Sequence, residues 1–384
     1  MFEDEYLEAR VLIVDDEPAN VRLLERILQR EGFSHIESTN DPRQFLALYA
    51  ARRPDILLLD LHMPGMDGFA VMEQLKGRIP PHEFIPILVL TADITPQARQ
   101  RALSAGAKDF LTKPVDPTEV VLRIRNLLEA RLAQIRANLE RLRWLPRDFG
   151  AKHVLVNAAS FETRVVENGA TIWTSKVIVG TPENQTVFFS DQMETVVFNP
   201  YWGVPKSIIL NEMLPEIYKD PYYMEREGYE VTDLNGNVIP SYSVDWYNLN
   251  TSNLPIGVRQ PPGPNNALGE IKFLFPNKHA IYMHDTPTKP LFEKPVRAYS
   301  HGCVRVQNPR EFAEIILGWD QQRIASMLAS TRNQSVPVED EIRVHVTYFT
   351  AWPDETGTIR YHDDVYGRDR LLEQAMGTLT VAMR

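Results

Sequence analysis

Cysteine is almost absent from this chain, which has one such residue, Cys303, among 384. A single cysteine excludes an intramolecular disulfide, so cysteine usage leaves the redox compartment undetermined. Basic clusters interleaved with aromatic residues are also missing, and the net charge of −10 argues against general nucleic-acid binding. Apolar runs such as residues 85–90 are far too short for a membrane-spanning helix. The N-terminal sequence MFEDEYLEAR lacks the apolar segment of a secretory signal peptide, so we expect the chain as written to be cytoplasmic.

Length and composition favour two or three folded domains, because 384 residues with 43% hydrophobic side chains can bury more than one core. We find no internal repeats. Up to about residue 116 the pattern alternates between apolar strand-like runs and amphipathic helices. The predicted helices cover residues 18–30, 42–51, 69–76 and 96–105. After Pro146 the pattern changes to β, with strands predicted at 154–157, 161–167, 172–177 and 342–349, and two short helices at 311–317 and 321–328.

The only thiol lies in a segment that contains the groups needed for acyl transfer. Cys303 follows Ser300, His301 and Gly302 directly, and a second histidine, His284, lies upstream. A thiol with a free pKa of roughly 8.5 is little ionised at neutral pH, and a histidine within hydrogen-bond reach removes that limit. Gly302 permits a sharp turn whose main-chain N–H groups can point at a developing oxyanion. The alternative is a buried, inert cysteine.

The spacing of this segment resembles the signature of the L,D-transpeptidase family (YkuD-type catalytic domain). A histidine is followed by 15 residues and then by the run Ser300 to Arg305, SHGCVR. The resemblance covers roughly residues 142–384. It implies that Cys303 is the nucleophile and His284 the base, and that backbone amides around residues 301–303 (His301, Gly302 and Cys303) form the oxyanion hole. Arg305 would hold the loop or a substrate carboxylate, and Asp285 would orient the base through its backbone or its carboxylate.

Acidic residues end two buried-strand patterns in the first third of the chain. Asp15 and Asp16 follow residues 10–14, and Asp60 ends residues 55–60. Because the carboxyl ends of neighbouring parallel strands converge on one crevice, these three carboxylates are expected to meet there. Such an oxygen-only set suits Mg²⁺. Together with the cation, Lys113 would offset the charge of a phosphoryl group on Asp60.

These residues resemble the CheY-like receiver domain of response regulators. The resemblance makes Asp60 the phosphoacceptor and Asp15 and Asp16 the acidic pair. The main-chain carbonyl of His62 would complete the metal site. The switch and phosphoryl-contacting positions would be filled by Thr91, Phe110 and Lys113. The alternative is a flavodoxin-like domain with incidental surface acids.

A long helix is predicted over residues 117–142, between the two halves. Leucine and isoleucine recur there at spacings of 4, 3, 4 and 3, at positions 128, 132, 135, 139 and 142. Two heptads are too few to specify a coiled coil. One interpretation is an extended last receiver helix that packs on its neighbours; the other is a helix that pairs two chains as a homodimer.

The predicted fold is therefore α/β followed by mainly β. It comprises a doubly wound, flavodoxin-like parallel-sheet receiver at 8–130, a linking helix at 131–146 and a mostly β catalytic domain at 147–384. Residues 211–266 are rich in Tyr, Pro and Asn and show little periodicity. The resemblance implies an inserted lid there, and the alternative is a long surface loop.

Two chemistries follow from the two resemblances. The first is peptidoglycan cross-linking through a Cys303 acyl-enzyme. Its substrates would be tetrapeptide stems, its inhibitors carbapenem β-lactams, and it would need no cofactor; hydrolysis is a variant. The second is phosphorelay at Asp60 from a sensor histidine kinase, with Mg²⁺ and an output or passenger C-terminal domain. A recombined chimera with uncoupled domains is the third interpretation. Receivers act in the cytoplasm, whereas such transpeptidases act outside the inner membrane.

Overall fold

The computed structural model describes residues 5–76, 78, 85–93, 95–250, 253–354 and 357–382, and the side chains of these except at 5, 76 and 378–382. The chain forms two compact units. The first comprises Met1–Trp144 with Phe349–Arg384, and the second comprises Leu145–Tyr348. Within the described ranges, no helix combines the length and apolarity needed to cross a membrane.

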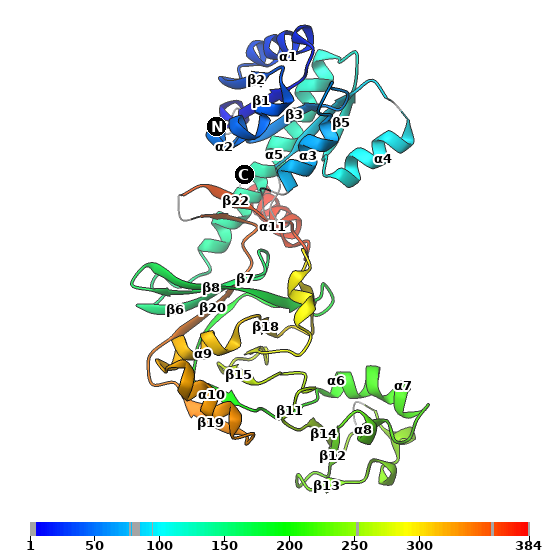
Figure 1. The fold of residues 1–384 in the computed structure, drawn as a ribbon, viewed down its shortest axis with the longest axis vertical. Helices are drawn as coiled ribbons and strands as arrows, with labels where there is room; N and C mark the ends of the chain where they lie inside the picture. Colours follow the sequence, from blue (N-terminus) through cyan, green and yellow to red (C-terminus); the bar gives the residue numbers. More distant parts are fainter. Residues whose placement is uncertain are drawn as a thin grey trace. The chain divides into compact units, whose positions relative to one another are not determined.

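The first unit contains a five-stranded parallel sheet covered by helices on both faces (Figure 1). The strand order is β2-β1-β3-β4-β5, the doubly wound order predicted from the sequence. One core joins the sheet to α1 and α5, and a second core joins its other face to α2, α3 and α4. The bounds are β1 (Arg10–Val14), α1 (Pro18–Glu31), β2 (His35–Thr39), α2 (Phe45–Arg52), β3 (Ile56–Asp60), α3 (Gly68–Lys76), β4 (Ile87–Thr91), α4 (Pro96–Ala105), β5 (Asp109–Thr112) and α5 (Pro117–Leu142).

Local sequence explains where these helices begin and end. Proline opens α1, α4 and α5, where its missing N–H and fixed φ cost nothing. Gly32 ends α1 with a φ of 105°, a left-handed conformation that glycine adopts without a steric penalty. The amphipathic helix predicted at residues 18–30 buries one apolar face of α1: Val21, Leu24, Ile27 and Leu28 are all buried.

The second half of α5 buries polar side chains instead of a leucine seam. The Gln134 amide donates hydrogen bonds to the carbonyl oxygens of Thr350 and His362, at 3.0 and 2.9 Å. Asn138 donates to the Thr350 hydroxyl at 2.7 Å. Leu139 is 56% exposed. Thr350 and His362 therefore pack against α5, and Phe349–Arg384 belong to the first unit, although the sequence interpretation grouped this segment with the catalytic domain.

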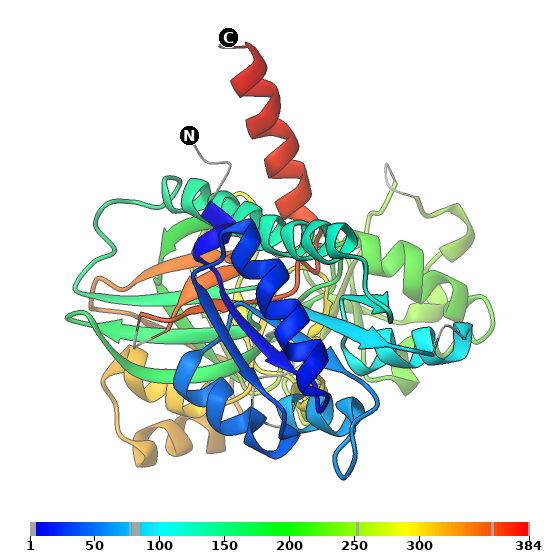
Figure 2. The same cartoon turned by 90° about the horizontal axis from the view of Figure 1, so that it is seen from above.

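This C-terminal segment forms β21 (Ala351–Pro353), β22 (Ile359–Tyr361) and α11 (Arg368–Ala382). Figure 2 shows α11 extending from its contact with α5 toward the C-terminus. The guanidinium of Arg131 on α5 lies 3.9 Å from the ring centre of Tyr361 on β22. The predicted domain limits of 8–130, 131–146 and 147–384 stay a prediction, because the division into two units reflects only how segments of the chain pack together.

The second unit is built on an 11-stranded curled sheet, which confirms the mostly β prediction. Its central path runs β15-β16-β18-β8-β7-β6-β20, with β17 paired to β8. Asn168 and Gly169, with φ of 50° and 83°, form the hairpin turn between β7 and β8. The bounds are β6 (Lys152–Asn157), β7 (Glu162–Glu167), β8 (Ala170–Gly180), β9 (Phe189–Gln192), β10 (Thr195–Phe198), β15 (Ile271–Leu274), β16 (Met283–His284), β17 (Ala298–Ser300), β18 (Val304–Val306), α9 (Pro309–Leu317), α10 (Gln321–Ala329), β19 (Gln334–Pro337) and β20 (Arg343–Thr347).

Between β10 and β15 the chain forms a small subdomain, the lid, rather than an ordinary loop. It has its own four-stranded sheet, β11-β14-β12-β13, and its own buried core around Met213, Met224 and Trp246. Its elements are β11 (Trp202–Gly203), α6 (Lys206–Ile208), the π-helical turn η3 (Ile209–Met213), α7 (Leu214–Ile217), α8 (Tyr223–Arg226), β12 (Glu230–Thr232), β13 (Val238–Ile239) and β14 (Gly257–Gln260).

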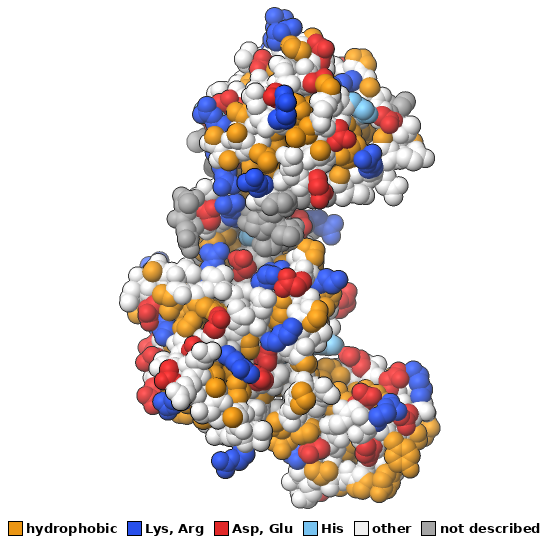
Figure 3. All heavy atoms as spheres, viewed as in Figure 1, with side chains coloured by type: hydrophobic (Ala, Val, Ile, Leu, Met, Phe, Trp, Pro, Cys, Tyr) orange, Lys and Arg blue, Asp and Glu red, His pale blue; other side chains and the backbone are white. Residues whose placement is uncertain are grey.

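Hydrophobic side chains gather on the outer surface of the lid (Figure 3). Its large exposed residues include Tyr218, Tyr222, Leu234, Tyr242 and Tyr247. Where the chain leaves the lid, the Asn266 amide donates to the carbonyl oxygens of Pro200, Gln260 and Pro261. These hydrogen bonds fasten the lid's exit strand to its entry strand.

Candidate active site and phosphoacceptor site

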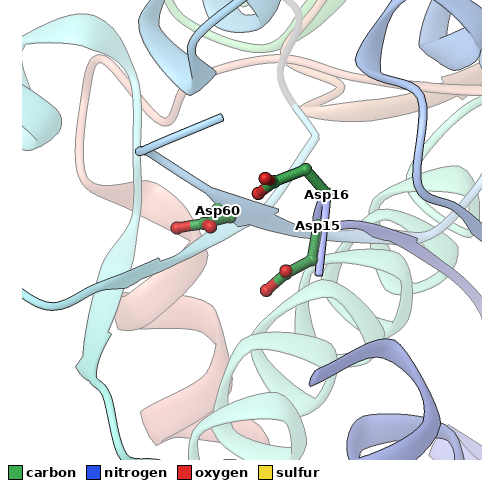
Figure 4. Close-up of side chains that lie close together, drawn as sticks. All are labelled: Asp15, Asp16 and Asp60. Carbon is green, nitrogen blue, oxygen red and sulfur yellow. The ribbon is translucent and has the colours of Figure 1, made fainter. Parts of the chain in front are cut away.

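The three predicted acidic residues meet at the carboxyl ends of β1 and β3 (Figure 4). Carboxylate oxygens of Asp15, Asp16 and Asp60 lie within 4.8 Å of one another. The ammonium of Lys113, which follows β5, lies 2.8 Å from a carboxylate oxygen of both Asp15 and Asp60. The peptide bond between Lys113 and Pro114 is cis. The crevice therefore combines three acids with one cation, as the strand order predicts.

The electrostatics of this crevice favour a bound divalent cation. Burial, together with the charges of Asp60 and Asp15, raises the pKa of Asp16 above its ordinary value. Burial opposes the charge on Lys113, but its hydrogen bonds to Asp15 and Asp60 raise its pKa overall. Three carboxylates with one ammonium leave excess negative charge, and an all-oxygen set suits Mg²⁺. The main-chain N–H of His62 donates to Asp60 at 3.3 Å.

The two predicted switch residues line one small cavity. Thr91 is buried at the end of β4, and its hydroxyl accepts a hydrogen bond from the Asp93 N–H at 3.0 Å. Phe110 on β5 is partly buried, and the guanidinium of Arg99 lies 3.8 Å from its ring centre. A cavity of about 190 Å³ lies between them and α4.

In the second unit, Cys303 stands in a tightly fastened turn between β17 and β18. Gly302 has a φ of 109°, which disfavours any residue with a Cβ. Its N–H donates to the Ser300 hydroxyl at 3.1 Å, and its carbonyl accepts from the Thr186 hydroxyl at 2.8 Å. The Ser300 hydroxyl donates to the Cys303 carbonyl. The turn that presents the thiol is thus fixed from both sides.

His284 is buried on β16, and its ring orientation is set by the main chain. Nδ1 is hydrogen-bonded to the carbonyl oxygen of Asp285, so Nδ1 carries the proton and Nε2 is the free acceptor. Burial and the nearby charge of Arg305 lower the pKa of His284 to about 3. The imidazole is therefore neutral, as a general base must be. The thiol of Cys303 has its hydrogen-bond partner in the carbonyl oxygen of Ala280, 3.8 Å away.

The carboxylate of Asp285 does not take part in orienting the imidazole. It forms an ion pair with Lys289 and accepts the Glu270 N–H at 2.9 Å. Gly269, with a φ of 60°, packs so closely that an added Cβ would lie 2.2 Å from this carboxylate. The alternative left open by the sequence is decided by geometry: the carbonyl of Asp285, and not its carboxylate, holds His284.

The remaining predicted residues lie on either side of the thiol. His301 is about half exposed and bonds Glu212 of the lid through Nε2 at 2.9 Å, so its side chain fastens the lid instead of contacting the thiol. Arg305 on β18 is paired with His284 across the sheet. Its Nε is buried and has no hydrogen-bond partner among the described residues.

Sequence reasoning missed two residues at this site. Lys272 on β15 is the cross-strand partner of His284. Tyr282 contacts both: its ring centre lies 4.0 Å from the Lys272 ammonium and 5.6 Å from the His284 ring. Burial raises the pKa of the Tyr282 phenol, so it stays protonated. The alternation of residues 271–274 could have revealed Lys272, because it places this lysine on one face of a strand, between two buried apolar residues.

Two families match this chain in separate regions. The L,D-transpeptidase catalytic domain matches residues 151–346, about half of the chain, and the response regulator receiver domain matches residues 11–125. A curated relative named "Putative L,D-transpeptidase" from Haemophilus influenzae is 38% identical over 241 residues, which are 62% of this chain and 48% of the relative.

The first unit also has relatives of similar sequence. "Response regulator PleD" of Caulobacter vibrioides is 44% identical over 126 residues, 33% of this chain and 27% of that protein. A solved structure of chemotaxis protein CheY4 from Vibrio cholerae is 30% identical and covers 31% of this chain and 98% of its own, with a TM-score of 0.28. The chain spans about half or less of the length of these two curated relatives.

Proposed function

The chain belongs to the L,D-transpeptidase catalytic domain family and also carries a response regulator receiver domain, and we propose on this premise that Cys303 forms a thioester with a peptidoglycan stem peptide. The donor is a tetrapeptide stem and the acceptor is an amine of a second stem. The observation that carries the proposal is the fixed tautomer of His284, whose Nδ1 is bonded to the Asp285 carbonyl. Nε2 is left as the acceptor for the thiol proton.

The proposed reaction has two steps. In the first, the thiol proton passes to Nε2 of His284 while sulfur attacks the carbonyl carbon of the L,D-peptide bond. The C–N bond breaks, and D-alanine leaves with the proton from His284. In the second, the acceptor amine attacks the thioester carbonyl carbon, the C–S bond breaks, and the amine proton passes through Nε2 of His284 to the departing sulfur of Cys303. The Gly302 N–H donates to the Ser300 hydroxyl, so the main-chain N–H of Cys303 would be the donor to the oxyanion, and one such donor is worth on the order of 10²–10³ in rate.

A carbapenem and a defined donor test this proposal on the full chain. Intact-mass measurement should show one carbapenem adduct on the wild-type protein and none on Cys303→Ser. Incubation with a purified disaccharide-tetrapeptide should release D-alanine and yield a cross-linked dimer. Release of D-alanine with tripeptide as the sole product would establish hydrolysis instead. A carbapenem adduct that persists in Cys303→Ser would contradict the assignment of the nucleophile.

The crevice of the first unit favours a second function, phosphoryl transfer to Asp60 from a sensor histidine kinase. Asp15, Asp16, Asp60 and the carbonyl of His62 would hold Mg²⁺, which supplies charge neutralisation when bound. Lys113, 2.8 Å from Asp60, is placed to contact a phosphoryl group there. Acetyl phosphate with Mg²⁺ should add one phosphoryl group to the wild-type chain and none to Asp60→Asn.

The two functions can be coupled or independent. Beryllofluoride mimics the phosphoryl group, so carbapenem acylation rates with and without it measure the coupling directly. We expect a change of less than about tenfold, or roughly 1.4 kcal/mol in barrier. A larger change that vanished in Asp60→Asn would make the receiver a regulator of the transpeptidase.

A further inference from the structure

Three charged or titratable residues form a row across adjacent strands beside Cys303. Lys272 on β15 pairs with His284 on β16, and His284 pairs with Arg305 on β18. Residues paired directly across strands project from the same face of a sheet. Lys272, His284 and Arg305 therefore lie side by side, with the imidazole between two cations.

The residues next to this row confirm which face it occupies. Phe273, Met283 and Val304 alternate with the row along the three strands, and all three are fully buried. Because side chains alternate along a strand, the row projects from the opposite face. The Lys272 ammonium lies 4.0 Å from the ring centre of Tyr282, two residues before His284, which places Tyr282 on that face as well.

Cys303 reaches the same group of side chains. Its neighbour Val304 donates its N–H to the Tyr282 carbonyl at 3.0 Å, so the turn that carries the thiol runs beside Tyr282. The groups that act on the thiol are Lys272 from β15, Tyr282 directly before β16, and Arg305 from β18, and His284 lies between Lys272 and Arg305 in the row. His301, on the thiol's own turn, is engaged with Glu212.

The charges in this row bear on which group stabilises the thiolate of Cys303. A cysteine–histidine pair usually holds its thiolate against an imidazolium. Here burial, with Arg305 and Lys272 nearby, lowers the pKa of His284 to about 3, so an imidazolium is strongly disfavoured. Burial also raises the pKa of the Cys303 thiol, while hydrogen bonds from the Tyr282 N–H and phenol and the charges of Lys272 and Arg305 oppose that rise. Burial lowers the pKa of Lys272 and of Arg305, and the charge of Cys303 opposes that fall, so the thiolate and these two cations stabilise one another.

We propose that Lys272 supplies the positive charge that stabilises the Cys303 thiolate, from its place in the Lys272–His284–Arg305 row. The proton balance of the proposed reaction is unchanged: His284 still accepts and returns the proton, and Lys272 keeps its own throughout. The inference rests on the proposed function only in taking Cys303 as the nucleophile. Arg305 is the second cation, but it follows the thiol turn directly, so its removal would disturb that turn as well.

Iodoacetamide alkylation of the full chain tests this proposal without any peptidoglycan substrate. The rate of alkylation, followed by intact mass across a range of pH, reports the titration of the thiol. An opposite charge close to an ionisable group shifts its pKa by about 1–3 units. Lys272→Met should therefore move the midpoint upward by about one unit or more. Below both midpoints the fraction of thiolate in this variant should fall about tenfold. Because a more basic thiolate is also more nucleophilic, the alkylation rate should fall by only about threefold.

Two further variants separate charge from structure. Lys272→Arg should restore the wild-type midpoint, since it keeps the charge. Lys278→Met removes an exposed lysine from the loop that joins β15 to β16 and should leave the midpoint unchanged. A folded Lys272→Met protein with the wild-type midpoint would overturn the proposal, and Lys272→Gln serves if Met prevents folding. If the midpoint shifts in Lys272→Met but the wild-type protein does not turn over the tetrapeptide donor, the proposed transpeptidase function is refuted and this inference stands.

Discussion

The carbonyl oxygen of Asp285 holds Nδ1 of His284, while the carboxylate of the same residue faces Lys289 and the Glu270 N–H. One residue thus has two separate tasks. Its main chain sets the tautomer of the proposed base, and its side chain fastens the end of β16 to neighbouring segments. Because the carbonyl survives any substitution, the base should stay oriented when the carboxylate is removed.

Asp285→Asn is expected to keep the carbapenem acylation rate within about threefold of wild type. The buried carboxylate loses its ion pair, so the free energy of unfolding should fall by about 1–3 kcal/mol. Urea denaturation and intact-mass kinetics on the same preparation measure both quantities. Lys289→Gln is the matched control, and it should show a smaller loss of stability because Lys289 is about half exposed. A hundredfold slower acylation in Asp285→Asn would assign the orienting role to the carboxylate.

His284→Ala should slow acylation by about 10²–10⁴-fold, the usual contribution of a general base. His301→Ala should slow it much less, because the His301 ring is engaged with Glu212 of the lid. Stopped-flow measurement of carbapenem acylation compares the two variants. Equal losses in both would place His301 in the proton transfer.

Labelling of Asp60 by acetyl phosphate should require Mg²⁺ and weaken as the pH falls. A metal ligand must be deprotonated to bind, and the raised pKa of Asp16 means that this ligand protonates at a higher pH than an ordinary aspartate. Asp16→Asn should remove part of this pH dependence while lowering Mg²⁺ affinity. Mg²⁺ titrations at several pH values provide the measurement. Labelling that is undiminished after chelation would argue against a metal site here.

Asn138→Ala should lower the free energy of unfolding of the first unit by about 1–3 kcal/mol, because it removes the buried acceptor of the Thr350 main-chain N–H and the donor to the Thr350 hydroxyl. Leu139→Ala, one residue further along α5, should change it by less than about 0.5 kcal/mol, because Leu139 is 56% exposed. Urea denaturation with a probe in the first unit distinguishes the two. If instead Leu139→Ala converted a dimer into a monomer in sedimentation, the homodimer interpretation of this helix would be supported.

Much of the fold could be predicted because its signals are local. The helix at 117–142 follows from its proline start and sustained periodicity, and the structure gives it the same bounds. The parallel sheet with acids meeting at its carboxyl edge follows from apolar runs that end in acids. The lid could not be divided into elements in this way. Its short strands carry no periodic pattern, and its core forms only when distant residues such as Met213 and Trp246 meet.

The sequence by itself determined the chemical groups of this protein: one thiol in a glycine turn, a histidine upstream, and acids at the ends of two strands. Motif spacing suffices there because backbone geometry fixes where adjacent residues can point. Only the tertiary structure decided that the Asp285 carbonyl orients His284, that His301 contacts the lid, and that Lys272 stands beside the base. Those relationships depend on strand register and on contacts between segments far apart in the chain. No fixed spacing of residues along the sequence predicts them.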